Sequence, residues 1–399
     1  MMDDRSKLVP FSRMRRQPDP ARAAEFAATA RRLQREREAA AEVITKTLAT
    51  TPRAKWPALA QRSDFRNSGA LEQLGREVDR NLGSAPLDAL AVAELSVAIA
   101  ETLTADSYPA VMLAQMRGHA WKDVGLALCH SSRYDEALEA LDRAQAALAP
   151  IGILGHDEAI VAFVRAATLQ HLRRFDEAQA LLTSCADVFR MYADTVLYDK
   201  CAVSRGILLV RRGDYRAARE LLRPLEGRTD DLSDASVRLA LGWCGIHLAD
   251  NVEALQQFTR AMNMFTALGC ALPALRAAAG IGAALLRLGD LERAIHQLSA
   301  TRERFLRRDM TEEAGLTGLE IVEAQLQRGD ADVEDARALC ARIVREFTVA
   351  GMNRRAIEAL AYLNDAVSTR SASPEVVRSV HDYIVALRND PTREFAAIN

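Results

Sequence analysis

Two cysteine–histidine pairs have side chains of the kind that bind metal ions or act in nucleophilic catalysis. Cys244 and His247 lie one helical turn apart, and Cys129 and His130 are adjacent. A structural zinc site takes four ligands, and nothing in the sequence signals further ligands near the first pair. Adjacent residues on a helix point about 100° apart, so the second pair does not face one another. Neither pair predicts a metal site or a catalytic dyad.

Paired carboxylates could act as general acid and base, and two such pairs are Asp135-Glu136 and Asp176-Glu177. Both stand at expected helix starts, where carboxylates complement the positive end of the helix dipole. Gly280-Ile-Gly282 resembles the front of a dinucleotide-binding loop, but it lies within an Ala-rich helical pattern with no strand before it. The sequence also contains no phosphate-loop, zinc-protease or nucleophile-elbow motif. We therefore predict that the protein is not an enzyme and uses neither cofactor nor metal.

The amino-acid composition indicates the class of fold and the kind of partner. Hydrophobic residues make up 49% of the 399 residues and aromatic residues only 5%, and Ala and Leu supply most of the apolar content. Because Ala is the best helix former and few segments alternate in the manner of strands, we expect an all-α protein. Lys and Arg number 52 against 54 Asp and Glu, a net charge of −2. This balance gives no general electrostatic case for nucleic acid.

The cysteines and the apolar segments predict a cytoplasmic location. The six cysteines are widely and unevenly spaced, which is typical of buried free thiols in a reducing compartment. They are Cys129, Cys185, Cys201, Cys244, Cys270 and Cys340. No apolar run approaches the length of a membrane span, and the first residues show no signal-peptide pattern.

The N-terminal part is expected to be a flexible basic arm, residues 1–20, followed by a helical module, residues 21–105. Helices are expected at about 21–48, 69–82 and 87–104. Ten Lys or Arg against six acids give residues 1–38 a local excess of +4. This excess fits a solvated helix face, a contact for nucleic acid or an acidic protein, or a role in self-association or capping.

Residues 106–350 contain about six copies of one pattern. Each copy has a small turn residue, then an aromatic or apolar residue, then an alanine three positions later. These alanines, 41, 40, 36, 40 and 42 residues apart, are Ala137, Ala178, Ala218, Ala254, Ala294 and Ala336. Such a period indicates stacked helix-turn-helix units. A large apolar residue four positions after the alanine is suited to nest against the partner helix; these residues are Leu141, Leu182, Leu222, Phe258 and Leu298.

The best copy resembles the tetratricopeptide repeat family. Trp121, Val124, Gly125 and Leu128, followed by Tyr134 and the Ala137 helix, follow the pattern of that repeat. Gly206, Gly242 and Gly282 take the place of Gly125 in later copies, and Ala166 does so in the second. The resemblance covers roughly residues 108–348 with a period longer than the usual 34. It implies a right-handed superhelical solenoid, after which residues 351–399 are expected to form a capping hairpin and tail.

The resemblance also implies a concave groove lined by the first helix of each hairpin. The groove candidates are His119, Lys122, Leu126, Phe163, Gln170, Lys200, Val203, Trp243 and Arg276. Phe163 and Trp243 are equally well explained as core residues. The basic and amide residues with which some relatives clamp a carboxylate are not reproduced, since only Lys122 fits them.

Two functions of different class remain open. The first is a protein- or peptide-binding scaffold or adaptor that uses the groove. The second is a regulatory sensor that responds to a peptide or small effector and acts on a transcription or signalling partner. We expect a protein or peptide partner, no membrane, no nucleic acid except through the basic arm, and self-association as an open alternative.

Overall fold

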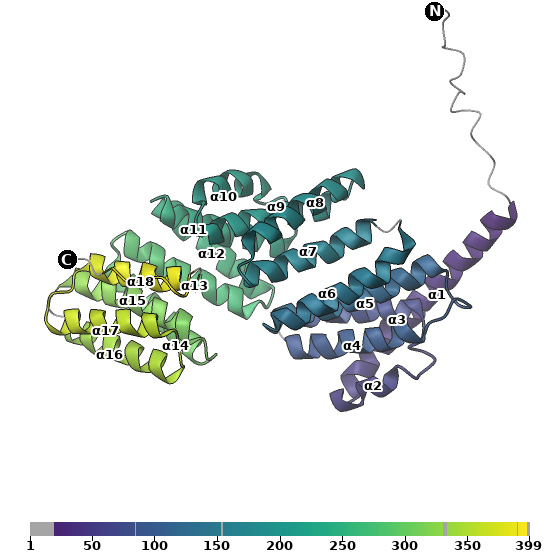
Figure 1. Cartoon of the computed structure of the whole chain (residues 1–399), viewed down its shortest axis with the longest axis horizontal. Coiled ribbons are helices and arrows are strands. Elements are labelled where there is room, and N and C mark those ends of the chain that lie inside the picture. Colours follow the sequence, from purple (N-terminus) through teal and green to yellow (C-terminus); the bar gives the residue numbers. More distant parts are fainter. Residues whose placement is uncertain (1–19, 84, 153–154, 330–332, 389, 397–399) are drawn as a thin grey trace, which may run out of the picture. The chain divides into compact units, whose positions relative to one another are not determined.

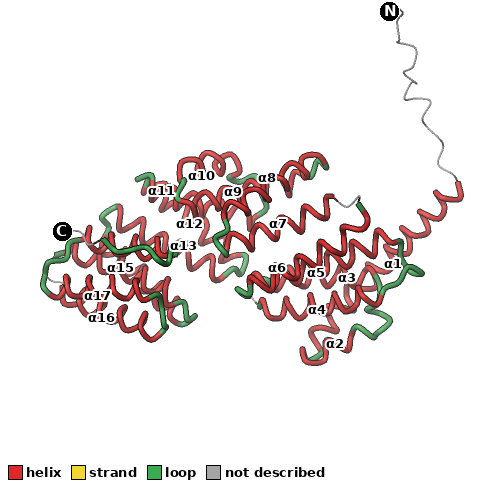
Figure 2. The backbone as a smooth tube through the Cα atoms, viewed as in Figure 1, coloured by secondary structure: helices red, strands yellow, loops and turns green. Residues whose placement is uncertain are grey.

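The computed structural model describes residues 20–396, apart from 84, 153–154, 330–332 and 389. The basic arm expected at residues 1–20 therefore lies, except for Pro20, outside the described residues. Every secondary-structure element in this part of the chain is a helix, as Figure 2 shows. The prediction of an all-α protein is confirmed.

The helices follow one another in pairs along the chain (Figure 1). Within the described ranges, short 3₁₀ helices accompany them at Arg53–Lys55, Ala149–Ile151 and Arg223–Leu225. The α-helices are α1 (Pro20–Thr50), α2 (Trp56–Leu59), α3 (Ser68–Asn81), α4 (Pro86–Thr102), α5 (Ala110–His130), α6 (Tyr134–Leu148), α7 (Gly155–His171), α8 (Phe175–Met191), α9 (Thr195–Arg212), α10 (Tyr215–Leu222), α11 (Asp231–His247), α12 (Asn251–Ala267), α13 (Ala271–Arg287), α14 (Leu291–Leu306), α15 (Thr311–Arg328), α16 (Val333–Val349), α17 (Arg354–Ser368) and α18 (Pro374–Leu387).

The chain forms two compact units, Met1–Asp157 and Glu158–Asn399. In the first unit α1 packs against α3, α3 against α4, α4 against α5 and α5 against α6. Its core contains fully buried Ile44, Phe65 and Leu74. In the second unit each even-numbered helix from α10 to α14 packs against the odd-numbered helices before and after it.

In four hairpins, a glycine of the first helix receives the large residue that stands sixteen positions later. A methyl group added to Gly206 would lie 2.3 Å from Leu222 Cδ2, and one added to Gly282 would lie 2.4 Å from Leu298 Cδ2. Gly125 with Leu141 and Gly242 with Phe258 repeat this arrangement. Each of these large residues is fully buried, so the small residue sets how closely the paired helices approach.

The turn between the paired helices needs one residue with left-handed backbone. Gly213 and Gly289 provide it with φ of 85° and 79°. After Gly213, the Asp214 side chain accepts a hydrogen bond from the Ala217 N–H and caps the next helix. Ala249 occupies the same turn position with φ of 61°. An L-residue with a side chain is strained there.

The odd-numbered helices form the inner layer of the second unit. Helices α9, α11, α13 and α15 contact one another in sequence, in addition to their even-numbered partners. The layer whose helices approach one another more closely lies on the shorter arc of a bent stack. We therefore refer to the accessible side of these helices as the inner face.

The end of the second unit departs from this scheme. Helix α18, rather than α17, packs against α15 (Figure 1). It buries Val377, Val380, Ile384 and Leu387 in the core shared with α15, α16 and α17. This places the other side of α18 beside the inner face.

The first prediction concerns the helix pairing. Gly206→Ala should lower the free energy of unfolding by about 1–3 kcal/mol, because the new methyl group overlaps Leu222. Gly75→Ala is the matched control, since it also lies within a helix but its nearest foreign atom, Asp123 Oδ2, would be 3.6 Å away. It should be neutral or stabilising by up to about 1 kcal/mol. Urea denaturation measures both, and equal effects would contradict the packing argument.

The second prediction concerns the turn. Ala249→Gly should raise the free energy of unfolding by about 0.5–1 kcal/mol, since glycine adopts the left-handed conformation without strain but is more flexible when unfolded. Ala300→Gly, at an exposed position within α14, should instead lower it by about 1 kcal/mol. Thermal unfolding of the two variants checks the opposite signs.

Candidate binding surface

Ion pairs join neighbouring helices of the inner layer. Lys200 Nζ on α9 lies 3.3 Å from Asp230, directly before α11, and Arg276 on α13 lies 3.7 Å from Glu313 on α15. Both pairs are partly exposed, so each contributes little to stability. They neutralise two of the cations that the sequence placed in a groove.

The groove candidates of the first unit are also engaged. His119 Nε2 lies 2.7 Å from Asp157 Oδ1, and Gln115 Nε2 donates to Asp157 Oδ2 at 3.1 Å. The hydrogen bond from His119 lowers the pKa of Asp157. Lys122 Nζ lies 2.6 Å from Asp123, and Leu126 is half-buried. The cations of this set therefore face carboxylates of their own chain.

The remaining candidates of the second unit differ in accessibility. Gln170 and Val203 are each only 5% exposed, and Gln170 donates to Ser204 on α9. Phe163 is half-buried. Trp243 is also half-buried and contacts the edge of Phe258 with ring centroids 5.1 Å apart. Gln170 and Val203 therefore contribute mainly to packing between helices, whereas Phe163 and Trp243 keep part of their surface accessible.

A group of charged residues around α18 was not predicted as a site. We call it the α18 cluster: Arg287, Glu320, Glu323, Arg378, His381 and Asp382. At its centre Glu323, only 2% exposed, accepts hydrogen bonds at one oxygen from Arg287 and Arg378, both at 2.5 Å. Glu323 thus joins α13, α15 and α18. Removal of one arginine partner from such a buried carboxylate strongly destabilises the folded protein.

Glu320 has the opposite environment, although it lies only three residues away on the same helix. No described residue forms a hydrogen bond or an ion pair with its carboxyl. Protein atoms surround the carboxyl, yet part of the residue stays accessible to solvent. Burial raises the pKa of Glu320 to about 7, against the lowering effect of His381 and Arg287. The carboxyl therefore titrates near neutral pH.

The surroundings of the cluster extend to α10 and α11. The ring of His247, at the end of α11, stacks on Tyr215 of α10 with centroids 3.9 Å apart and planes 4° from parallel. Partial burial lowers the pKa of His247, while the charge of Asp382 acts in the opposite direction. Side chains from α10, α11, α13, α15 and α18 therefore converge on one part of the inner face.

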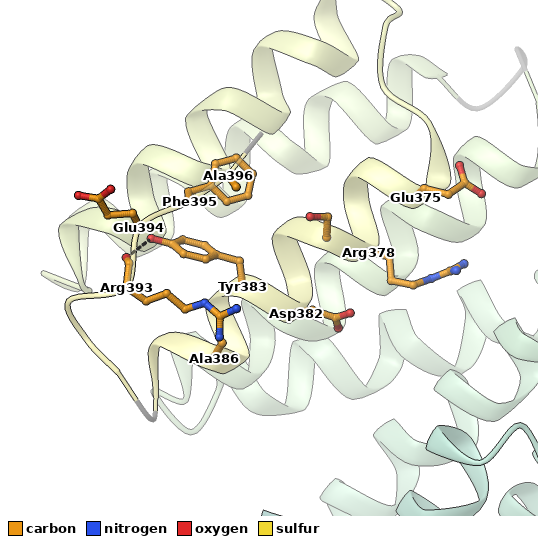
Figure 3. A pocket seen from close by; sticks show the side chains of 10 residues that line it. Glu375, Arg378, Asp382, Tyr383, Ala386, Arg393, Glu394, Phe395 and Ala396 are labelled. Carbon is orange, nitrogen blue, oxygen red and sulfur yellow. Dashed lines mark hydrogen bonds between the residues drawn. The ribbon is translucent and has the colours of Figure 1, made fainter. Parts of the chain in front are cut away.

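A cavity of about 620 Å³ adjoins the cluster along α18 (Figure 3). Arg378 and Asp382 belong to both. The chain segment that follows α18 forms the opposite wall, where Tyr383 Oη donates to the carbonyl oxygen of Arg393 at 2.8 Å. The lining residues are Glu375, Arg378, Ser379, Asp382, Tyr383, Ala386, Arg393, Glu394, Phe395 and Ala396.

Neither thiol–imidazole pair has the properties of a reactive site. Cys244 is fully buried, and burial raises the pKa of its thiol to about 11, so it is protonated at neutral pH. Among the described residues, no three His, Cys, Asp or Glu side chains are arranged to hold a metal ion. In the same part of the chain, no helix has both the length and the apolar character required to traverse a bilayer.

Comparison with solved structures identifies the fold. A signal-transduction ATPase with numerous domains from Pyrococcus horikoshii, described as having a tetratricopeptide repeat sensor, matches 90% of this chain at 12% identity and a TM-score of 0.56. The match covers 53% of that protein, so this chain spans about half its length. A Rap protein complexed with Competence and Sporulation Factor matches 89% of this chain and 99% of its own, at 14% identity and a TM-score of 0.50.

The fold is tetratricopeptide-repeat-like. These similarities confirm the helix-pair solenoid that the sequence predicted. By sequence, no protein family and no curated protein matches the chain. The evidence for what this tetratricopeptide-like stack binds therefore comes from its own residues.

The third prediction is a pH dependence at Glu320. A carboxyl with a raised pKa in the folded state stabilises the fold below its ordinary pKa, and this contribution is lost as the pH rises through about 7. Glu320→Gln should therefore become more stable relative to the natural chain between pH 5 and pH 8, by on the order of 1–2 kcal/mol. Glu358→Gln, at an exposed position on α17, controls for the loss of one carboxylate. Urea denaturation at both pH values tests this, and an unchanged difference would refute it.

Proposed function

We propose that this chain is a non-enzymatic binding module that holds a protein or peptide against the inner face of its second unit, at the α18 cluster. The observation that carries the proposal is the contrast between Glu323, which has two arginine partners, and Glu320, which has none among the described residues. A ligand that brings a positive charge to a partly desolvated carboxyl stabilises the charged form of that carboxyl. The bound segment should therefore contain a Lys or Arg side chain that reaches Glu320.

Accessible aromatic and charged side chains on the inner helices α11 and α13 support a macromolecular ligand. Trp243 exposes part of its ring, and Arg276 is 47% exposed beside Glu313. Aromatic and arginine residues supply much of the binding energy at protein interfaces. Burial raises the pKa of the thiols of Cys185, Cys201, Cys244 and Cys340, so these thiols are protonated and unreactive, which favours binding over catalysis. Five of the six cysteines are buried, which favours a reducing, cytoplasmic location.

A ligand-responsive sensor acting on a transcription or signalling partner is the second candidate. Glu323 favours it, because this one carboxylate joins α13, α15 and α18, so a ligand that rearranges its partners would change how these helices are spaced. One similar structure is described as containing a sensor and the other as a complex with a factor. Compaction on ligand binding in small-angle scattering would distinguish this sensor from an adaptor of constant shape.

The fourth prediction locates the partner. A photo-crosslinking residue in place of Arg276, on the inner helix α13, should give adducts with the partner in the cell of origin. The same residue in place of Arg293, on α14 and 71% exposed, should give at least about tenfold less, because α14 belongs to the other layer. The two sites are matched in residue type, and mass spectrometry of the adducts measures both. Equal yields, or adducts only from position 293, would place the partner elsewhere.

A further inference from the structure

We propose that residues 391–396 act as an intramolecular ligand, occupying a slot that accepts a partner peptide with an aromatic anchor. The slot is formed by Asn353, Arg355, Tyr362 and Tyr383, on and beside α17 and α18. It adjoins the cavity of Figure 3. This inference rests on the proposed function. It specifies the chemistry of the part of the partner that would bind beside the α18 cluster.

The slot binds the main chain of the segment through side-chain donors. Arg355 Nη1 and Tyr383 Oη both donate to the carbonyl oxygen of Arg393, at 3.1 and 2.8 Å. Asn353 Nδ2 donates to the carbonyl oxygen of Pro391 at 3.3 Å. Every residue type offers a main-chain carbonyl, so these contacts recognise the main chain irrespective of its sequence.

One aromatic side chain gives the slot its selectivity. The ring of Phe395 lies near two tyrosine rings, with its centroid 5.4 Å from Tyr362 and 4.9 Å from Tyr383, tilted by about 60°. These are the distances of favourable aromatic pairs. Phe395 is partly buried, whereas residues 391–394 and 396 are exposed. The anchor therefore stands two residues after the carbonyl that accepts two hydrogen bonds.

The seated segment leaves room for a larger ligand. About 620 Å³ remains between it and α18, and Figure 3 shows Asp382 and Arg378 along the α18 side of this space. Three hydrogen bonds and the ring of Phe395 hold the segment, and Phe395 packs at the edge of the core beside Tyr383. The rest of the apolar face of α18 packs against α15, α16 and α17, so it stays covered when the segment leaves. A partner peptide that presents the same aromatic anchor and extends along α18 would displace it.

The fifth prediction uses the chain's own segment as the probe. The nine-residue peptide of residues 391–399, added to the full-length chain carrying Phe395→Ala, should bind in the vacated slot. Saturation-transfer NMR on the peptide's phenylalanine protons should give a dissociation constant about fivefold or more lower than with the natural chain, whose own segment competes at high effective concentration. The same peptide with Phe395→Ala should bind neither chain. Equal binding to both chains, or no saturation by several millimolar peptide, overturns the proposal.

A second pair of variants tests the slot without added peptide. Arg355→Ala removes a donor to the Arg393 carbonyl, whereas Arg354→Ala, at the neighbouring position on α17, removes only a surface pair with Glu358. Amide hydrogen exchange at Thr392 and Arg393, whose N–H groups donate to Asp390, should accelerate several-fold in the first variant alone. Equal rates in both variants count against the slot. If these experiments fail, crosslinking at position 276 can still support the proposed function. If that crosslinking fails, these experiments can still show that the slot holds residues 391–396.

Discussion

The nesting of a large side chain onto a small one is the contact on which the repeat array depends. Leu222 against Gly206 and Leu298 against Gly282 show it most clearly, since a single methyl group would not fit. Because the large residue is fully buried, each hairpin has one allowed separation between its helices. Repetition of the same separation along the chain gives the layered stack.

The closeness of the inner layer determines its electrostatics. When α9, α11, α13 and α15 approach one another, charged residues on adjacent helices come within ion-pair distance, as Lys200 does with Asp230. The inner face is therefore largely self-neutralised, and it is not a positively charged groove. Against this background an unpaired carboxyl such as Glu320 is distinctive, because the surrounding protein has already removed part of its water.

The last helix, α18, departs from the repeat arrangement and brings charged and aromatic side chains together. A further regular hairpin would place its first helix against α15, but α18 takes that position. Its polar side then brings Arg378 to Glu323, and its far end leads into the segment anchored by Phe395. The end of the array thus combines a charged cluster, an aromatic slot and an open cavity. In the binding function proposed above, one partner chain would reach all three.

The sequence determined the helices, their pairing and the contact that joins each pair. These follow from local periodicity, since a helix buries every third or fourth residue and the repeat places small and large residues sixteen positions apart. It did not reveal the ion partners of Lys200 and Arg276, which lie 30 and 37 residues away on the next inner helix. Nor did it reveal the α18 cluster, although polar residues at helical spacing along α18 hinted at a second face. Arg378 and Glu323 are 55 residues apart, and only the departure of α18 from the repeat brings them together. Local propensity acts over a few residues of chain, whereas the burial of a carboxyl depends on which helices surround it, and that is decided by tertiary packing.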